Sequence, residues 1–389
     1  MNVRTVAIIG GGPAGARAAE TLARGWGSAC SVRVFEERVG WEKPCGGGLS
    51  HKALARYPFL AAATEGSRLV HDAEFVAPSG EAMHFHLRSP LAIYARSTLN
   101  QLLLRRAAAA GAEVVSDHIL EMRRCPTGWE FAGRTCNYHA DYVILAGGAR
   151  SRLRKLVAPD FAARDFMLTF GYRIPASSGL LRVQFYDEFE GYAWAFPRPD
   201  HLSVGICAKT GEERMPALRA RLDAFLRKFG YDPALGRVYS HLLPALSVES
   251  WAALRLQGPG WALVGDAAGL VDPVTGEGIY YALRSGELAA EALLEGLPEI
   301  YPERVWNDFG RALALGARLA GTFYYGEFLG RSVTTRMVEF GARSARFLEV
   351  VQDLVEGSQS YLGLTFRLYL GLARALLETG PTFLRESLS

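Results

Sequence analysis

A glycine-rich turn between a strand and a helix is the feature that most constrains the fold of this chain. Residues 6–9 (VAII) form a short apolar run that is typical of a buried strand, and the turn Gly10-Gly-Gly-Pro-Ala-Gly15 follows it directly. Helical periodicity then continues to Arg24, and residues 32–35 (VRVF) form a second apolar run. The order predicts a strand, a helix and a second strand packed as one βαβ unit.

The spacing of the three glycines gives this unit a chemical purpose. Gly10 permits the tight turn, Gly12 lets a diphosphate approach the backbone, and Gly15 lets the helix pack closely on the strand. The start of the helix supplies N–H groups and a positive dipole end to the phosphates. We therefore predict dinucleotide contacts at Gly10, Gly12, Pro13, Ala14 and Gly15.

An acidic pair closes the second strand, about twenty residues beyond the turn. A carboxylate at Glu36 can accept both ribose hydroxyls of an adenosine, and Glu37 lies beside it. The negative charge disfavours a ribose 2′-phosphate, so the pattern favours FAD or NAD over NADP. The first motif alone does not choose between FAD and NAD.

A second glycine-rich segment makes that choice. Residues 261–264 form an apolar strand that ends in Gly265-Asp266, where one carboxylate can meet a polyol such as the ribityl chain of a flavin. Pro273 and the run from Gly276 through Gly278 to Ile279 then open another helix, whose N–H groups would face the negative charge of a reduced flavin ring. NAD has no ribityl chain, so the two segments together predict FAD. The alternative for Gly265-Asp266 is a helix cap.

The order of strand-like and helix-like segments predicts an α/β fold with a β-rich insertion. A Rossmann-like FAD-binding domain is expected to hold an inserted antiparallel β-rich substrate domain, and a C-terminal helical region follows. The expected ranges are 1–68, 92–165 and 250–298 for the FAD-binding domain, 69–91 and 166–249 for the β-rich domain, and 299–389 for the helical region.

Six sequence features together resemble a known family over residues 3–295. The glycine-rich turn, Arg96, the Ala146-Gly-Gly-Ala-Arg-Ser151 segment and Gly265-Asp266 resemble the single-FAD flavoproteins of the hydroxylase type. Lys43-Pro-Cys-Gly-Gly-Gly-Leu49 and Tyr192-Ala-Trp-Ala-Phe-Pro197 resemble the geranylgeranyl reductase branch of that fold.

The resemblance implies roles for individual residues. It implies that Glu36 and Arg96 hold the adenosine and diphosphate side of FAD, and Asp266 the ribityl chain, while residues 276–278 lie at the edge of the flavin ring. It also implies that the Cys45-Gly46-Gly47 turn lies near the isoalloxazine. One departure concerns Gly147, where the family usually has an aspartate, which weakens any role tied to that carboxylate.

The implied reaction is reduction of C=C bonds in a prenyl or other hydrophobic substrate, with hydride transfer from N5 of the reduced flavin. Such a substrate needs a long, apolar and dry pocket, for which Tyr192, Trp194, Phe196 and Pro197 are the predicted wall. Plain core packing is the alternative for these side chains. The thiol of Cys45 is the candidate catalytic group, as a proton donor or as part of the flavin's environment; a small buried apolar residue is the alternative.

Two other functions compete with alkene reduction. The same fold serves FAD-dependent monooxygenases and halogenases that act on small aromatic or polyketide-type substrates, but a halogenase is expected to carry Ile where this chain has Phe196. The third alternative is an FAD-binding scaffold without enzymatic activity. No second GxGxxG turn is present, so electrons are expected from NAD(P)H that docks transiently or from a reduced protein carrier.

Composition narrows the partners and the compartment. A net charge of +3 without a basic, aromatic-rich block argues against nucleic acid, and five scattered cysteines with no metal-like spacing favour reduced thiols, no metal site and a cytoplasmic protein. The run from Tyr361 to Leu377 places Arg367 and Arg374 among apolar residues. It predicts either a helix that caps the core or an amphipathic helix in peripheral contact with a membrane.

Overall fold

The computed structural model describes residues 3–63, 65–364 and 367–368, and these form two compact units. Unit 1 contains Met1–Lys43, Arg96–Ala162 and Leu243–Leu313, and unit 2 contains Pro44–Ala95, Ala163–Leu242 and Ala314–Ser389. Each unit is built from three separate stretches of the chain.

A six-stranded, mostly parallel sheet is the centre of unit 1. Its order is β16-β17-β10-β1-β2-β6, and every neighbouring pair is parallel except β16 with β17. The central strands are apolar along their whole length because they are covered on both faces. The strands are β1 (Thr5–Ile9), β2 (Ser31–Phe35), β6 (Glu113–Val115), β10 (Tyr142–Leu145), β16 (Gln257–Gly258) and β17 (Trp261–Leu263).

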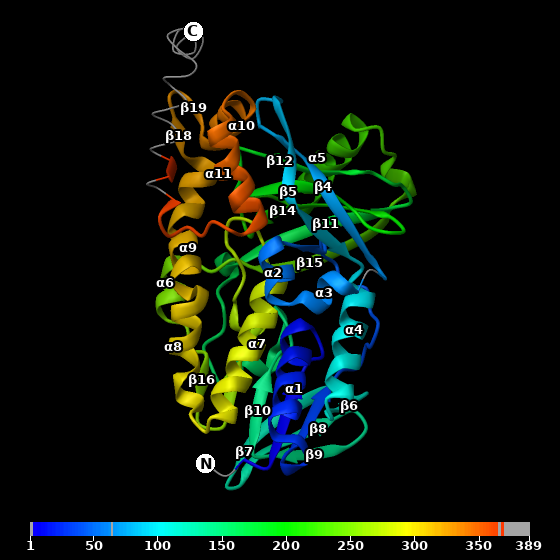
Figure 1. Ribbon diagram of the computed structural model, residues 1–389, viewed down its shortest axis with the longest axis vertical. Helices are drawn as coiled ribbons and strands as arrows, with labels where there is room; N and C mark the ends of the chain where they lie inside the picture. The colour runs from blue at the N-terminus through cyan, green and yellow to red at the C-terminus, as the bar shows by residue number, and fades with distance from the viewer. Residues whose placement is uncertain (1–2, 64, 365–366, 369–389) are drawn as a thin grey trace. The chain divides into compact units, whose positions relative to one another are not determined.

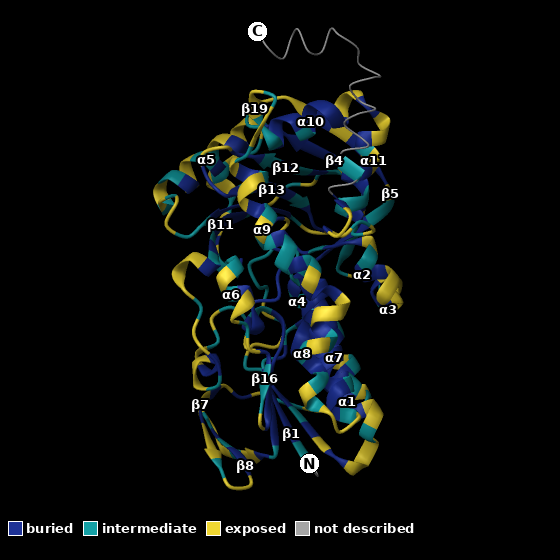
Figure 2. Ribbon diagram, turned by 90° about the vertical axis from the view of Figure 1, so that its left-hand side faces the viewer, coloured by how far each residue is buried: buried dark blue, intermediate teal, exposed yellow. Residues whose placement is uncertain are grey.

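Helices α1 (Pro13–Trp26), α4 (Arg96–Ala109) and α7 (Ile279–Leu294) pack beside one another in unit 1. Figure 1 shows α1 between α7 and α4, and α1 contacts both. Helix α7 is buried along most of its length, as Figure 2 shows. A Cβ at Gly286 of α7 would lie 2.1 Å from the carbonyl oxygen of Ala14, so the two helix backbones touch where α1 begins.

A buried charge network also joins α1 to α7. Glu287 of α7 is 5% exposed and accepts hydrogen bonds from Arg17 of α1 and, at 2.6 Å, from Arg284. Asp308 accepts two further hydrogen bonds from Arg284, at 2.7 and 2.8 Å. Burial alone would raise the pKa of Glu287, but the two arginines outweigh it and lower that pKa to about 2.

The remaining elements of unit 1 are short. They comprise the small sheet of β7 (Ile119–Cys125), β8 (Gly128–Gly133) and β9 (Asn137–Ala140), the helices α6 (Val248–Ala252) and α8 (Tyr301–Val305), the π-helical turn Trp306–Gly310, and the 3-10 turns Gly27–Ala29, Arg152–Leu156, Gly265–Ala268 and Pro298–Ile300. Helix α9 (Arg311–Tyr325) begins in unit 1 and continues in unit 2.

An eight-stranded sheet forms the body of unit 2, in the order β15-β11-β14-β13-β12-β4-β5-β3. From β11 to β3 the neighbours pair antiparallel as predicted, except that β12 runs parallel to β4. The exception is possible because a long connection separates β4 from β12, so no hairpin fixes their relative direction. The strands are β3 (Gly48–Leu49), β4 (Ser67–Val76), β5 (Ala82–Tyr94), β11 (Phe166–Ile174), β12 (Leu180–Phe185), β13 (Gly191–Pro197), β14 (Leu202–Lys209) and β15 (Arg237–Pro244).

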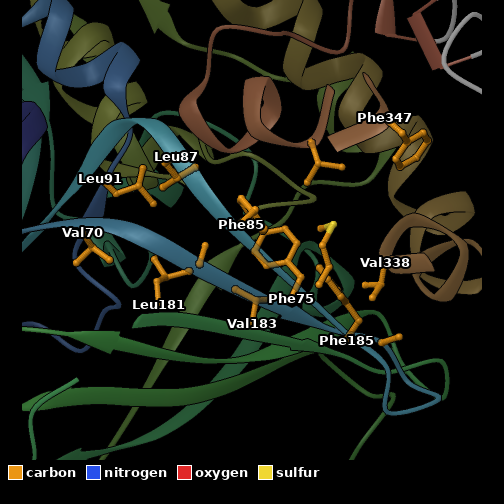
Figure 3. Close-up of a cluster of buried hydrophobic side chains, with 14 of the residues drawn as sticks. Val70, Phe75, Phe85, Leu87, Leu91, Leu181, Val183, Phe185, Val338 and Phe347 are labelled. Carbon is orange, nitrogen blue, oxygen red and sulfur yellow. The ribbon is translucent and has the colours of Figure 1, made fainter. Parts of the chain in front are cut away.

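Helices cover both faces of this sheet. On one face α5 (Met215–Lys228) buries its apolar side chains against β11 and β14. On the other face α10 (Val333–Arg343) and α11 (Ala345–Glu356) contribute Val338 and Phe347 to a cluster with Phe75, Phe85 and Phe185, which Figure 3 shows. The other elements are α2 (His51–Arg56), α3 (Pro58–Ala62), the 3-10 turns Ala163–Asp165 and Pro233–Leu235, and the hairpin of β18 (Glu327–Phe328) and β19 (Arg331–Ser332).

The domain boundaries differ from those expected from sequence. Residues 44–68 belong to unit 2 rather than to the FAD-binding domain, because β3 pairs with β5 and β4 already begins at Ser67. The described C-terminal helices divide between the units: α10 and α11 pack on β5 in unit 2, while residues 299–313 belong to unit 1. The mixed α/β fold class itself is confirmed.

The C-terminal run that predicts a capping or membrane-lying helix falls mostly on residues 365–366 and 369–389, outside the described part of the chain. Within it Arg367 is described, and it donates hydrogen bonds to Asp353 at 2.7 Å and to Gln359 at 2.6 Å. Across the described residues, no helix combines the length and the apolar character needed to cross a bilayer.

The helix contact at Gly286 predicts a sharp difference between two glycine substitutions. Gly286→Ala should lower the free energy of unfolding by about 3 kcal/mol, because the new methyl group meets the backbone of Ala14. Gly321→Ala in α9 is the matched control: its Cβ meets no atom of the described residues within 4 Å, so it should be neutral or stabilising by up to about 1 kcal/mol. Urea unfolding measures both. Equal effects would contradict the close contact.

The lowered pKa of Glu287 predicts a pH-dependent contribution to stability. An ionised Glu287 stabilises the folded protein fully above the unfolded-state pKa of about 4.3, and this stabilisation is lost as the pH falls toward about 2. Glu287→Gln should therefore cost about 3 kcal/mol at pH 7, and the difference from wild type should shrink below about pH 4. The exposed Glu295→Gln is the control, with an effect below about 0.5 kcal/mol. A pH-independent difference in unfolding free energy would refute this assignment.

Candidate active site

Gly10 and Gly15 of the glycine-rich turn are packed against backbone, whereas Gly12 faces open space. Gly10 has φ of +108°, and a Cβ there would lie 2.4 Å from the carbonyl oxygen of Ala146. A Cβ at Gly15 would lie 1.9 Å from the carbonyl oxygen of Gly10. At Gly12, by contrast, no atom of the described residues lies within 4 Å of the Cβ position. Two glycines are needed for packing, and the third faces open space where a ligand can approach.

The same open space lies at the start of α1. Gly12 is the N-cap residue, Pro13 is the first helical residue, and no side chain caps the helix. The N–H groups of Ala14 and Gly15 in the first turn therefore have no partner within the helix. An anion at this end would be favoured by these N–H groups and by the helix dipole.

The acidic pair after β2 divides between two environments. The carboxylate of Glu36 accepts N–H groups of Gly11 and Arg38, both at 2.9 Å, so it is fixed beside the glycine-rich turn. Glu37 instead forms ion pairs with Arg134 and, at 3.2 Å, with His118. The structure thus places Glu36 at the glycine-rich turn, and its role as a ribose ligand stays a prediction. The prediction for Glu37 has no such geometric support, because its carboxylate is engaged by these two side chains.

Arg96 is a buried cation for which the described residues provide no counter-ion. It begins α4, is 3% exposed, and donates from Nη2 to Asn100 at 3.4 Å, while its Nε has no hydrogen-bond partner among the described residues. The backbone N–H groups of Arg96 and Ser97 are bound by Glu42 at 3.0 and 2.7 Å, which fixes the start of the helix. Because an unpaired buried guanidinium is costly, this position calls for an anionic ligand.

The second glycine-rich segment meets the first one. Strand β17 continues into a 3-10 turn that contains Gly265, with φ of +58°, and Asp266. A Cβ at Gly265 would lie 2.9 Å from the Cβ of Ala14, so the two predicted halves of the site are in contact in unit 1. Arg154 donates to the carbonyl oxygen of Ala267 at 3.0 Å and holds the turn in place.

Asp266 also reaches the start of α7. A Cβ at Gly278 would lie 3.4 Å from Oδ1 of Asp266. The segment before the helix is shaped by Asp272, which accepts the N–H groups of Val274 and Thr275 at 2.9 Å and encloses Pro273 in the turn. Gly276 has φ of +71°, and Gly278 caps the helix before Ile279 without a side-chain hydrogen bond. The carboxylate and an uncapped helix start are thus neighbours.

Lys43 is a site residue that the sequence prediction did not assign. Its Nζ lies 2.8 Å from Oδ2 of Asp266, with 20% of the lysine side chain and 11% of the aspartate side chain exposed. Lys43 belongs to the Lys-Pro-Cys-Gly-Gly-Gly motif, so the motif was a signal, but its partner lies more than two hundred residues away. Only the fold identifies that partner.

Gly147, which departs from the family pattern, is a crowded position. It follows β10, and a Cβ there would lie 3.0 Å from the hydroxyl oxygen of Ser151. A side chain would require Ser151 to move. The absence of the usual aspartate therefore goes together with a tight turn, and its backbone is the only group that Gly147 can offer to a ligand.

The Cys45 turn belongs to unit 2. Cys45 is half-buried, and its Sγ accepts the N–H of Gly47 at 3.3 Å. A Cβ at Gly46 would lie 2.8 Å from the ring of Phe196 and 3.6 Å from Nε1 of Trp194. All five cysteines lie in the described part of the chain and none is in a disulfide. The structure thus brings the candidate thiol turn onto the predicted aromatic wall.

The aromatic wall lies along β13. Side chains alternate across a strand, so Tyr192, Trp194 and Phe196 share one face while Pro197 is on the opposite one. Tyr192 and Phe196 also pack against the apolar cluster of Figure 3, so core packing is part of their role. Trp194 is 6% exposed, and its indole N–H has no hydrogen-bond partner among the described residues. A ligand with an acceptor atom would satisfy that donor.

These features fit a flavin dinucleotide. In unit 1 an open glycine turn, an uncapped helix start and an unpaired buried arginine suit a diphosphate, and the carboxylates of Glu36 and Asp266 suit ribose and ribityl hydroxyls. When bound, such a cofactor supplies hydride or electron-transfer chemistry.

Comparison with known proteins agrees with this assignment. Residues 4–168 match the family model for the pyridine nucleotide-disulphide oxidoreductases. Geranylgeranyl diphosphate reductase of Arabidopsis thaliana is 30% identical over 327 residues, which are 75% of this chain and 66% of the plant protein. Menaquinone reductase of Mycobacterium tuberculosis is 28% identical over 366 residues, covering 83% of this chain and 85% of that protein. The chain thus spans just under two thirds of the plant enzyme.

Solved structures share the fold. A geranylgeranyl bacteriochlorophyll reductase-like protein from Thermoplasma acidophilum has a TM-score of 0.78 at 22% identity, covering 95% of this chain and 99% of that one. The flavin-dependent brominase Bmp2, as a triple mutant, has a TM-score of 0.61 at 17% identity, with coverages of 86% and 98%. Identities this low show the fold alone.

Fold and relatives together define an FAD-dependent oxidoreductase of the Rossmann-like, single-flavin class. Within this class the chain is similar to the geranylgeranyl reductases, with about 30% identity over 75% of its length.

The open space at Gly12 predicts a variant that separates folding from cofactor binding. Gly12→Ala should leave the unfolding midpoint of the apoprotein unchanged, because its methyl group meets no described atom. It should weaken FAD binding at least about tenfold, or about 1.4 kcal/mol, because that methyl occupies the approach to the diphosphate. Gly179→Ala is the control, since its Cβ position in unit 2 is equally open. FAD fluorescence titration gives both affinities; wild-type affinity in Gly12→Ala would exclude the diphosphate from this turn.

Proposed function

We propose that this protein uses reduced FAD to saturate C=C bonds in a prenyl chain or another hydrophobic substrate. The observation that carries the proposal is the Cys45 turn packed against Trp194 and Phe196: a thiol and an apolar, aromatic face belong to one surface of unit 2. The names of two relatives support it, because geranylgeranyl diphosphate is a prenyl compound and menaquinone carries a prenyl chain.

The residues of the chain would share the work as follows. The apolar rings of Trp194 and Phe196 would hold the chain of the substrate and exclude water, which keeps a reactive reduced cofactor from side reactions. The thiol of Cys45 would give a proton to one carbon of the double bond while the other carbon receives hydride. The buried N–H of Trp194 would bind an acceptor atom at the substrate's polar end.

The electron donor is a separate part of the proposal. We propose NAD(P)H docking transiently, or a reduced protein carrier, as the source of electrons. Stopped-flow reduction of the bound flavin by NADH, by NADPH and by a reduced ferredoxin distinguishes these sources, since the true donor should reduce the flavin within the turnover time.

An anaerobic experiment tests the reaction itself. Flavin reduced chemically in the absence of air should be reoxidised when geranylgeranyl diphosphate or a menaquinone is added, and mass spectrometry should find a product heavier by two hydrogens per double bond. A substrate that is hydroxylated or halogenated only after oxygen is admitted would instead support the monooxygenase alternative. Persistence of the reduced flavin with every prenyl compound would refute the proposal.

The proposed role of Cys45 predicts a selective loss of activity. Cys45→Ala should lower the turnover number about a hundredfold, the usual size of a general-acid contribution, while FAD binding stays within about twofold. Cys136→Ala is the matched control because Cys136 is exposed and lies in unit 1, so its turnover should equal that of wild type. A Cys45→Ala variant with full turnover would show that the thiol is a packing residue.

A further inference from the structure

A buried polar cluster holds the backbone of Cys45. Arg198, which directly follows the aromatic strand β13, is only 2% exposed, and its Nη2 donates to the carbonyl oxygen of Cys45 at 2.6 Å. The hydroxyl of Ser203 on β14 donates to the same oxygen at 3.0 Å. One carbonyl group thus accepts two hydrogen bonds, one of them from a buried cation.

Tyr239 in turn holds Ser203 and its strand in place. The hydroxyl of Tyr239 donates to the carbonyl oxygen of Val204 at 3.0 Å and lies 3.3 Å from the hydroxyl of Ser203. Burial raises the pKa of Tyr239 to about 12, so this hydroxyl stays neutral. Tyr239 occupies the space over Gly171, where a Cβ would lie 2.3 Å from its ring. Four neighbouring strands, β13, β14, β11 and β15, therefore contribute to the position of the Cys45 carbonyl.

The turn has little freedom above this anchor. Gly47 has φ of +84°, and a Cβ there would lie 2.3 Å from the carbonyl oxygen of Tyr94 and 3.0 Å from Cζ of Arg198. The carbonyl oxygen of Gly47 accepts the N–H of Tyr94 at 2.9 Å, and its own N–H donates to the thiol sulfur of Cys45. Hydrogen bonds hold the carbonyl of Cys45 on one side of the turn and the backbone of Gly47 on the other. The conformation of the turn therefore sets the direction of the thiol.

We infer that Arg198, assisted by Ser203, is the positioning residue of the Cys45 thiol. Arg198 acts through the backbone of the turn, at the carbonyl oxygen of Cys45. Its purpose is to keep the thiol in one orientation on the face that carries Trp194 and Phe196. The catalytic meaning of this orientation rests on the proposed role of Cys45, but the positioning itself does not, and it is measured below without turnover.

Alkylation of the thiol in the intact, FAD-loaded protein tests the inference. Iodoacetamide is added, and the rates at Cys45 and Cys136 are followed by peptide mass spectrometry, with the exposed Cys136 as an internal standard. Arg198→Met should raise the Cys45 rate relative to Cys136 at least tenfold, because a released turn exposes the half-buried sulfur. Arg198→Lys, which keeps a cation and a donor, should restore the rate to within about threefold of wild type.

Two further variants keep the test decisive. Ser203→Ala removes one of the two hydrogen bonds with little change in volume, and it should raise the relative rate about threefold even where Arg198→Met fails to fold. Arg336→Lys is the matched control: Arg336 is also a buried arginine of unit 2, but its partners are Glu339 and the carbonyls of Phe328 and Leu329, so the Cys45 rate should not change. Cys45 rates that stay at the wild-type value in both Ser203→Ala and Arg198→Met, or in Ser203→Ala alone where Arg198→Met does not fold, would overturn the inference. Loss of turnover alone would bear only on the proposed reaction.

Discussion

Close backbone contact around the start of α1 is the constraint on which unit 1 depends. Gly15 lets this helix approach the turn after β1, Gly10 lets that turn approach Ala146 after β10, and Gly286 lets α7 approach Ala14. These contacts bring three segments far apart in the sequence to within van der Waals distance of one helix end. Because they are backbone contacts, side chains cannot adjust to relieve a substitution. Among the described residues, the start of α1 is open at Gly12.

The distribution of buried charge follows from this geometry. Away from the glycine-rich turn, buried charges are paired within the protein: Glu287 lies between Arg17 and Arg284, and Arg284 also binds Asp308. In the candidate diphosphate site, Arg96 has no carboxylate partner among the described residues, and the start of α1 has no side-chain cap. The protein compensates its structural charges internally and leaves positive potential where an anionic cofactor would be bound.

In unit 2, close glycine contacts and buried polar groups fix the Cys45 turn. Its sheet separates two apolar clusters, and β13 contributes small residues to one and aromatic rings to the other. The glycines of the Cys45 turn let the backbone lie on those rings, and Gly205 leaves room for the ring of Trp194. A buried arginine and a serine then fix the carbonyl of Cys45, so a short, glycine-rich turn that would otherwise be flexible acquires a defined position.

The sequence by itself determined the local elements and the class of cofactor. Period and turn chemistry identified β1, α1, β2, β10 and β17, and the spacing of Gly10, Gly12 and Gly15 was sufficient to predict a dinucleotide, because these features act over a few residues. Only the tertiary structure decided which distant groups meet. The pairing of β3 with β5 places residues 44–68 in unit 2. Lys43 forms an ion pair with Asp266, and Arg198 donates a hydrogen bond to the carbonyl oxygen of Cys45. Such partners are selected by the packing of sheets and helices, and no local periodicity encodes them.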